Sequence, residues 1–133
     1  MVQVSVTAAV KVAGGPSLPL SLSLEPQSYT LSSVSLAKAG NNSGEDKDNE
    51  KVPLPAGTMV LFAVTVRNTT TGKPAQVKAK LKTNTTITVS DSLLIANESV
   101  LTHLFPDAAT REVALTNEGA AAVTVEILTC RSA

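Results

Sequence analysis

Aromatic side chains are scarce in this chain of 133 residues, which has one tyrosine, two phenylalanines and no tryptophan. Proteins that read single-stranded nucleic acid stack bases on aromatic rings, and few rings are available for that purpose. Net charge is also absent, because 11 basic and 11 acidic residues balance. Without a basic segment, nothing attracts phosphate groups over a distance. We therefore expect no nucleic-acid partner.

Cysteine is also scarce, and long apolar runs are missing. Cys130 is the single cysteine, so no disulfide can form within the chain. No apolar run approaches the roughly 20 residues of a membrane-spanning helix, and we expect no membrane insertion. The first residues alternate in polarity and do not form a charged segment followed by an apolar run, so no secretory signal is expected. A cytoplasmic or particle-associated protein is the expectation, unless a signal was removed.

Groups suited to catalysis are few. His103 is the only histidine, and no spacing connects it to the further ligands that a zinc site requires. A Cys130–His103 pair could act as a nucleophile and base, but few residues flank Cys130 to form a pocket. No serine lies in a G-x-S-x-G motif. We therefore predict a protein that is not an enzyme and that has no metal or cofactor.

Alternation of apolar and polar residues is the dominant pattern that is present. Aliphatic residues occupy the even positions of 2–12 and again of 18–24, against mostly polar residues at the odd positions. Side chains two apart share a face only in an extended strand, so both segments predict half-buried β-strands. Glycine and proline at 14–16 predict a hairpin turn between them.

The rest of the chain continues this rhythm, with one interruption. Segment 39–51 has no large apolar residue and predicts a long polar loop, followed by an extended segment to residue 56. At most one helical turn is expected, at 107–110. Further strands are expected at 28–37, 59–68, 75–83, 86–90, 92–96, 99–105, 111–117 and 121–130. Nine or ten strands with turns between them predict one all-β domain over 1–133, an antiparallel β-sandwich that is Ig-like or jelly-roll-like, without significant helix.

Two segments, 64–77 and 113–123, share a pattern in which an apolar-x-apolar-x-Asn strand is followed by a loop and Ala-x-Val. The asparagines are Asn68 and Asn117. This strand–Asn-turn–strand pattern resembles immunoglobulin-like accessory and adhesion domains of bacterial surface proteins. The resemblance implies a sandwich fold and brings no catalytic residue with it.

Lys78, Lys80 and Lys82 alternate with apolar residues and should form a row on one face of a strand. Such a row could bind an anion, for example a phosphate or a sulfated sugar. The alternative is a solvated face, or an edge strand that lysine protects against unwanted pairing.

Two predicted strands carry apolar residues on both faces. One face of each fits the core, and the opposite face should then meet water. The residues on this opposite face are Met59, Leu61, Ala63, Leu128 and Cys130. Exposed apolar surface usually marks a contact, so we predict that they touch a second copy. Two alternatives stay open: a β-bulge that exchanges the faces, or burial under segment 39–56.

These observations favour a non-catalytic structural protein that self-associates as the subunit of an oligomer, particle, fibre or surface layer. Its main partner would be a second copy of itself. The alternative is a module that binds a carbohydrate or another anionic surface through Lys78, Lys80, Lys82 and the 39–51 loop, or that binds another protein.

Overall fold

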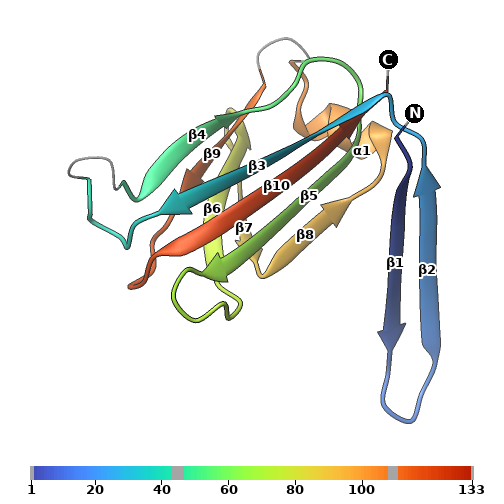
Figure 1. The fold of residues 1–133 in the computed structure, drawn as a ribbon, viewed down its shortest axis with the longest axis horizontal. Coiled ribbons are helices and arrows are strands. Elements are labelled where there is room, and N and C mark those ends of the chain that lie inside the picture. Colours follow the sequence, from blue (N-terminus) through green and yellow to red (C-terminus); the bar gives the residue numbers. More distant parts are fainter. Residues whose placement is uncertain (1, 43–46, 108–110, 133) are drawn as a thin grey trace.

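The computed structural model describes residues 2–42, 47–107 and 111–132, which form ten strands and one short helix (Figure 1). In chain order the elements are β1 (Val4–Lys11), β2 (Ser17–Leu24), β3 (Ser28–Leu36), β4 (Asn49–Pro53), β5 (Met59–Asn68), β6 (Gln76–Lys82), β7 (Thr85–Ser90), β8 (Ser92–Ile95), α1 (Glu98–Leu104), β9 (Glu112–Thr116) and β10 (Val123–Arg131). The prediction of an all-β antiparallel protein is confirmed.

Eight strands form two antiparallel sheets that face each other (Figure 1). Sheet I has the order β3-β10-β5-β8, and sheet II has the order β4-β9-β6-β7. From β3 to β10 the chain changes sheet at every connection except the β6–β7 hairpin. Eight strands in this order form a jelly roll, one of the two kinds of sandwich that the spacing predicted.

The core lies between the two sheets and is almost entirely aliphatic. In β6, Val77, Ala79 and Leu81 are buried while the lysines between them face outward. The even positions of β5 and the odd positions of β10 are mostly buried in the same way. Alternation thus creates the core because each strand of the sandwich contributes one face to it.

The segment 99–105, predicted as a strand, instead forms most of helix α1, with Phe105 as the C-cap of the helix. Asn97 caps this helix by accepting a hydrogen bond from the Val100 amide at 3.0 Å. Leu101 and Phe105 are buried one turn apart, and the Phe105 ring meets Phe62 edge-on at 5.2 Å. Apolar residues four apart suit a helix, and this spacing explains the correction. The helical turn predicted at 107–110 falls largely on residues 108–110, outside the described residues.

The predicted polar loop is also shorter than expected. Strand β4 begins at Asn49 and pairs with β9 at the edge of sheet II. Only Val52 of β4 is buried. An edge strand with a single core residue has no apolar alternation, so the pattern that revealed the other strands is missing here.

Strands β1 and β2 form a two-stranded sheet of their own. This hairpin, called the arm below, projects from the corner of the sandwich where β3 begins and β10 ends (Figure 1). Apart from their mutual pairing, β1 and β2 make no extensive contact with another described element.

Candidate interaction surfaces

The arm has one apolar face and one polar face. Its register pairs Val4 with Leu24, Val6 with Leu22, Ala8 with Leu20 and Val10 with Leu18, all on one side. The opposite side pairs serines and Thr7, with Ala9 opposite Pro19 and Lys11 opposite Ser17. The apolar face therefore contains four cross-strand aliphatic pairs and no charge, a composition that normally packs against another layer.

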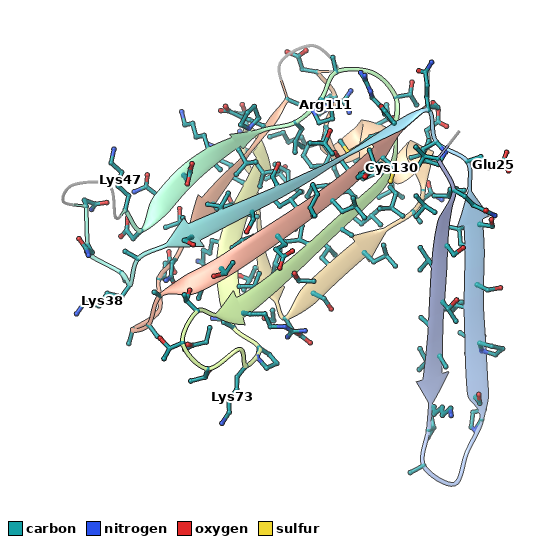
Figure 2. All side chains as sticks on the ribbon, viewed as in Figure 1. Glu25, Lys38, Lys47, Lys73, Arg111 and Cys130 are labelled. Atoms are coloured by element: carbon teal, nitrogen blue, oxygen red, sulfur yellow. The ribbon has the colours of Figure 1, made fainter. Side chains whose placement is uncertain are left out.

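Only the base of this face is covered. Val4, Val6, Leu22 and Leu24 are half-buried, whereas the tip is exposed: Val10 and Leu18 at 55% and 57%, and Leu20 at 49%. The alternation of the sequence predicts that one face of both strands is buried along its whole length. This prediction is wrong for the outer half of the arm, where the apolar face is exposed. The reason is topological, because no other layer of the described residues lies over the tip (Figure 2). We call Ala8, Val10, Leu18 and Leu20 the tip face.

Pro19 protects one edge of the arm. The Val12 amide donates to the Pro16 carbonyl at 3.1 Å, so Val12 and Pro16 form a hydrogen-bonded pair. In an antiparallel hairpin every second pair of opposite residues is hydrogen-bonded, and the pairs between them are not. The Ala9–Pro19 pair then falls between them, so the nitrogen of Pro19 points away from β1. Proline removes a donor from the free edge of β2 without interrupting the ladder inside the hairpin. This arrangement favours contact through the face of the arm over pairing along the β2 edge.

A second apolar surface crosses the outer face of sheet I. Leu31, Leu128, Ala63 and Leu94 stand directly opposite one another on β3, β10, β5 and β8. We call these four residues the outer row. Leu31 and Leu94 are 59% and 47% exposed, while Ala63 and Leu128 are half-buried. Tyr29, also exposed, lies two residues before Leu31 on the same face of β3.

The structure separates the five predicted contact residues into three groups. Ala63 and Leu128 belong to the outer row and retain accessible surface. Met59 lies in the core, because a register shift opposite Cys130 and Arg131 places Leu61 and Met59 on different faces. The β-bulge alternative therefore applies to Met59.

Leu61 and Cys130 stand opposite each other outside the main core cluster, and both are fully buried. Cys130 lies near the corner from which the arm leaves (Figure 2). Burial raises the pKa of its thiol, so the protonated form dominates at neutral pH. A buried, protonated thiol is the opposite of an activated nucleophile. His103, the other half of the predicted pair, is exposed in the last turn of α1.

The three predicted lysines do share the outer face of sheet II, but two of them have partners. Lys78 forms an ion pair with Glu118 at 3.6 Å, and the Lys82 ammonium donates to the His103 carbonyl at 3.0 Å. Lys80 is exposed and lies across Ala114 from Lys51 on β4, since both lysines pair with this alanine in the sheet register. Lys51 is a basic neighbour that sequence reasoning missed, because β4 was assigned to a loop.

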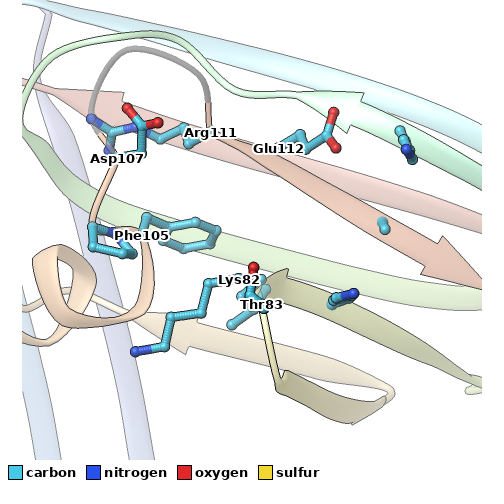
Figure 3. A pocket seen from close by; sticks show the side chains of 11 residues that line it. Lys82, Thr83, Phe105, Asp107, Arg111 and Glu112 are labelled. Carbon is cyan, nitrogen blue, oxygen red and sulfur yellow. The ribbon is translucent and has the colours of Figure 1, made fainter.

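A hollow of about 390 Å³ opens beside this row (Figure 3). Arg111 and Asp107 lie side by side at one end of the hollow. Burial lowers the pKa of Arg111, and the negative charge of Asp107 offsets only part of this shift. The charged side chains that line the hollow are those of Lys51, Lys80, Lys82, Arg111, Asp107 and Glu112. Four positive and two negative side chains give the hollow a positive balance, which suits an anionic group.

Within the described parts of the chain, no three His, Cys, Asp or Glu side chains are placed to hold a metal ion. No helix of these residues is long and apolar enough to cross a membrane. Comparison with known proteins gave no match to a protein-family model, a curated protein or a solved structure.

Proposed function

We propose that this protein is a self-associating structural subunit and that the arm is the part that binds a neighbouring copy. The observation that carries this proposal is an uncharged apolar tip face on a hairpin that stands clear of its own sandwich. Soluble domains seldom expose such a surface unless it binds something. An isolated two-stranded hairpin is also only marginally stable in water, so the arm gains order when another layer covers it.

The energy available is appropriate for association. Complete burial of a valine or leucine contributes about 1.5–3 kcal/mol, and the larger residues of the tip face are about half exposed. Covering one tip face would therefore contribute about 3–4 kcal/mol, and the partner surface would add a similar amount. Association costs about 4–15 kcal/mol in lost freedom. A contact that repeats, either reciprocally between two copies or along an assembly, is consequently favoured over a single one.

The jelly roll itself supports this function only weakly. Viral capsid proteins, lectins and cupins all use it, so the fold is compatible with a particle subunit and equally with a ligand-binding protein. The proposal depends on the arm and not on the sandwich.

The test is a measurement of native mass by light scattering at tens of micromolar. Leu18→Glu with Leu20→Glu places two charges on the tip face and should reduce the mass to that of one chain, 13.7 kDa. Ser17→Glu with Ser21→Glu adds the same charge to the opposite face of β2 and should leave the oligomer intact. A wild-type protein that is already a single chain at this concentration would refute the proposal.

A second candidate function is binding of an anionic group, for example that of an acidic sugar, in the hollow on sheet II. Lys51 and Lys80 carry it, because the side-chain ammonium group of neither has an ion-pair or hydrogen-bond partner within the described residues. Of the three aromatic residues, Phe62 and Phe105 are buried, so stacking of a sugar would depend on the distant Tyr29 alone.

A sulfated oligosaccharide titrated by calorimetry tests this second candidate. Lys51→Glu with Lys80→Glu should abolish a salt-sensitive binding signal, and Lys38→Glu, an exposed lysine far from the hollow, should not. No heat of binding to the wild-type protein at low salt would dismiss the candidate.

A further inference from the structure

The exposed large apolar residues of the described chain are not scattered. Of eight, four lie toward the tip of the arm (Val10, Val12, Leu18 and Leu20), and three lie on the outer face of sheet I (Tyr29, Leu31 and Leu94). Only Val100, on α1, belongs to neither group. One chain thus carries two separate apolar surfaces, and its own arm does not cover the outer row, where Leu31 and Leu94 remain exposed.

The two surfaces match in length. Together with Val12, the exposed residue that follows β1, the apolar side of the arm extends four residue steps from Ala8, or ~14 Å. From Leu31 to Leu94 the outer row crosses three strand spacings, also ~14 Å. An arm laid along this row would cross the strands of sheet I at nearly a right angle, which is one of the two preferred ways for sheets to pack.

The two surfaces also match in chemistry. Neither the tip face nor the outer row contains a charged residue. Lys11, the only charge between Val4 and Leu24, belongs to the polar face of the arm, which would remain in water. Ala63, near the middle of the outer row, leaves a shallow position between larger side chains for an aliphatic group of the arm to fill.

We propose that the tip face of one chain docks across the outer row of a second copy. This inference rests on the proposed function, because it names the receiving surface for the arm. The contact is between unlike surfaces, so it propagates from copy to copy unless symmetry closes it into a ring or a reciprocal pair. Jelly-roll bodies joined by arms in this way would form an assembly in which no sandwich has to open.

A complementation experiment tests the pairing of the two surfaces. The arm variant, Leu18→Glu with Leu20→Glu, keeps an intact outer row. The row variant, Leu31→Glu with Leu94→Glu, keeps an intact arm. Each variant alone should have the mass of one chain by light scattering. Mixed in equal amounts, at a concentration well above that of the wild-type measurement because only one contact can form, they should give a heterodimer of twice that mass, in which one intact arm meets one intact row.

Ser35→Glu is the matched control for the row variant, since it adds a charge to the same face of β3 four residues from Leu31. It should leave the wild-type oligomer unchanged. Circular dichroism and melting of each variant establish that the sandwich is folded.

The outcomes separate the two proposals. If the row variant stays oligomeric while the arm variant dissociates, the arm functions but the outer row is not its receiver. If both dissociate and the mixture does not associate, the tip face and the outer row do not contact each other, and this inference is overturned. If the wild-type protein is a single chain, the proposed function fails and this inference fails with it.

Discussion

Leu31 and Leu94 stand at opposite ends of one cross-strand row, on the two edge strands of sheet I. Both point away from the core, and both are about half exposed. On the other side of the same sheet, Phe62 and Ile127 are buried in the core. Sheet I is therefore apolar on both faces at this level. A sheet of this kind usually lies between two layers, and the described part of the chain supplies one of them at this level.

Hydrogen exchange should distinguish the arm from the sandwich. At concentrations too low for association, the arm amides should exchange almost as fast as in an unfolded chain, because a two-stranded hairpin is only marginally stable. At high concentration they should become protected, while exchange of β5 and β10 stays the same. Mass spectrometry of peptic fragments at two concentrations measures the difference. The arm of the Leu18→Glu, Leu20→Glu variant should exchange fast at both concentrations. Protection of the arm that does not depend on concentration would contradict the proposed docking of the arm.

Asn117 should be among the most sensitive positions of the sandwich. It is 1% exposed, and its amide donates to the carbonyls of Ala37 and Ala121 at 2.9 Å while its oxygen accepts from the Gly119 amide. Asn117→Ala would remove all three of these partly buried hydrogen bonds, at a cost of about 2–4 kcal/mol in the free energy of unfolding. Urea unfolding, performed in the monomeric arm variant to remove the effect of association, measures this loss.

Asn68 provides the matched comparison, since it occupies the same place in the repeated strand–Asn-turn pattern. Its oxygen accepts from the amides of Thr70 and Thr71, but the bonds are exposed and water can replace it. Asn68→Ala should cost about 0.5–1 kcal/mol. Equal losses for the two substitutions would mean that burial is not what makes Asn117 important.

Much of the sandwich could be predicted from alternation, because a strand with one buried face has an apolar residue at every second position. β5 was predicted at its observed bounds, and most other strands to within two residues. The errors occur where burial does not follow this period. Helix α1 buries Leu101 and Phe105 four apart, and β4 buries Val52 alone.

The candidate surfaces were less predictable for a different physical reason. Alternation reveals that a residue is on the apolar face of a strand, but not whether a second layer covers that face. The leucines of β2 follow the same pattern as Val64 and Val66 of β5, yet the tip of β2 is exposed and these valines are in the core. Leu31 and Leu94 were missed because neither strand by itself reveals a row that runs across the sheet. Only the pairing of four strands places them in one row.

Acidification should loosen the segment that precedes β4. The Asp48 carboxylate accepts hydrogen bonds from the Asn49 amide group at 2.8 Å and from the Gly40 amide at 2.9 Å. These bonds, that of Asn49 first, lower the pKa of Asp48 from its ordinary value of 3.8. The stabilisation is present above pH 3.8 and is lost as the pH falls through the lower folded value. An NMR titration of the Gly40 amide should therefore show a midpoint below 3.8.

Asp48→Asn tests the same bond by removing the charge. The variant should be less stable than the wild-type protein at neutral pH, and the difference should disappear at pH values below the folded pKa of Asp48. Glu50→Gln, at an exposed position of the neighbouring strand β4, serves as the control for loss of a negative charge in this segment. A stability difference for Asp48→Asn that persists unchanged at low pH would assign the effect to packing instead of charge.

Cys130 should react slowly with thiol reagents in the native protein. Its side chain is fully buried, and burial raises the pKa of the thiol, so both access and thiolate formation are suppressed. If exposure of the thiol requires opening that costs about 4 kcal/mol, reaction with Ellman's reagent should be roughly 1,000-fold slower than in denaturant. The rate should be the same for the wild-type protein and the monomeric arm variant, because Cys130 is covered by its own chain. A thiol that reacts rapidly in the arm variant and slowly in the wild-type oligomer would instead place Cys130 in the contact between copies, as its position in the sequence first indicated.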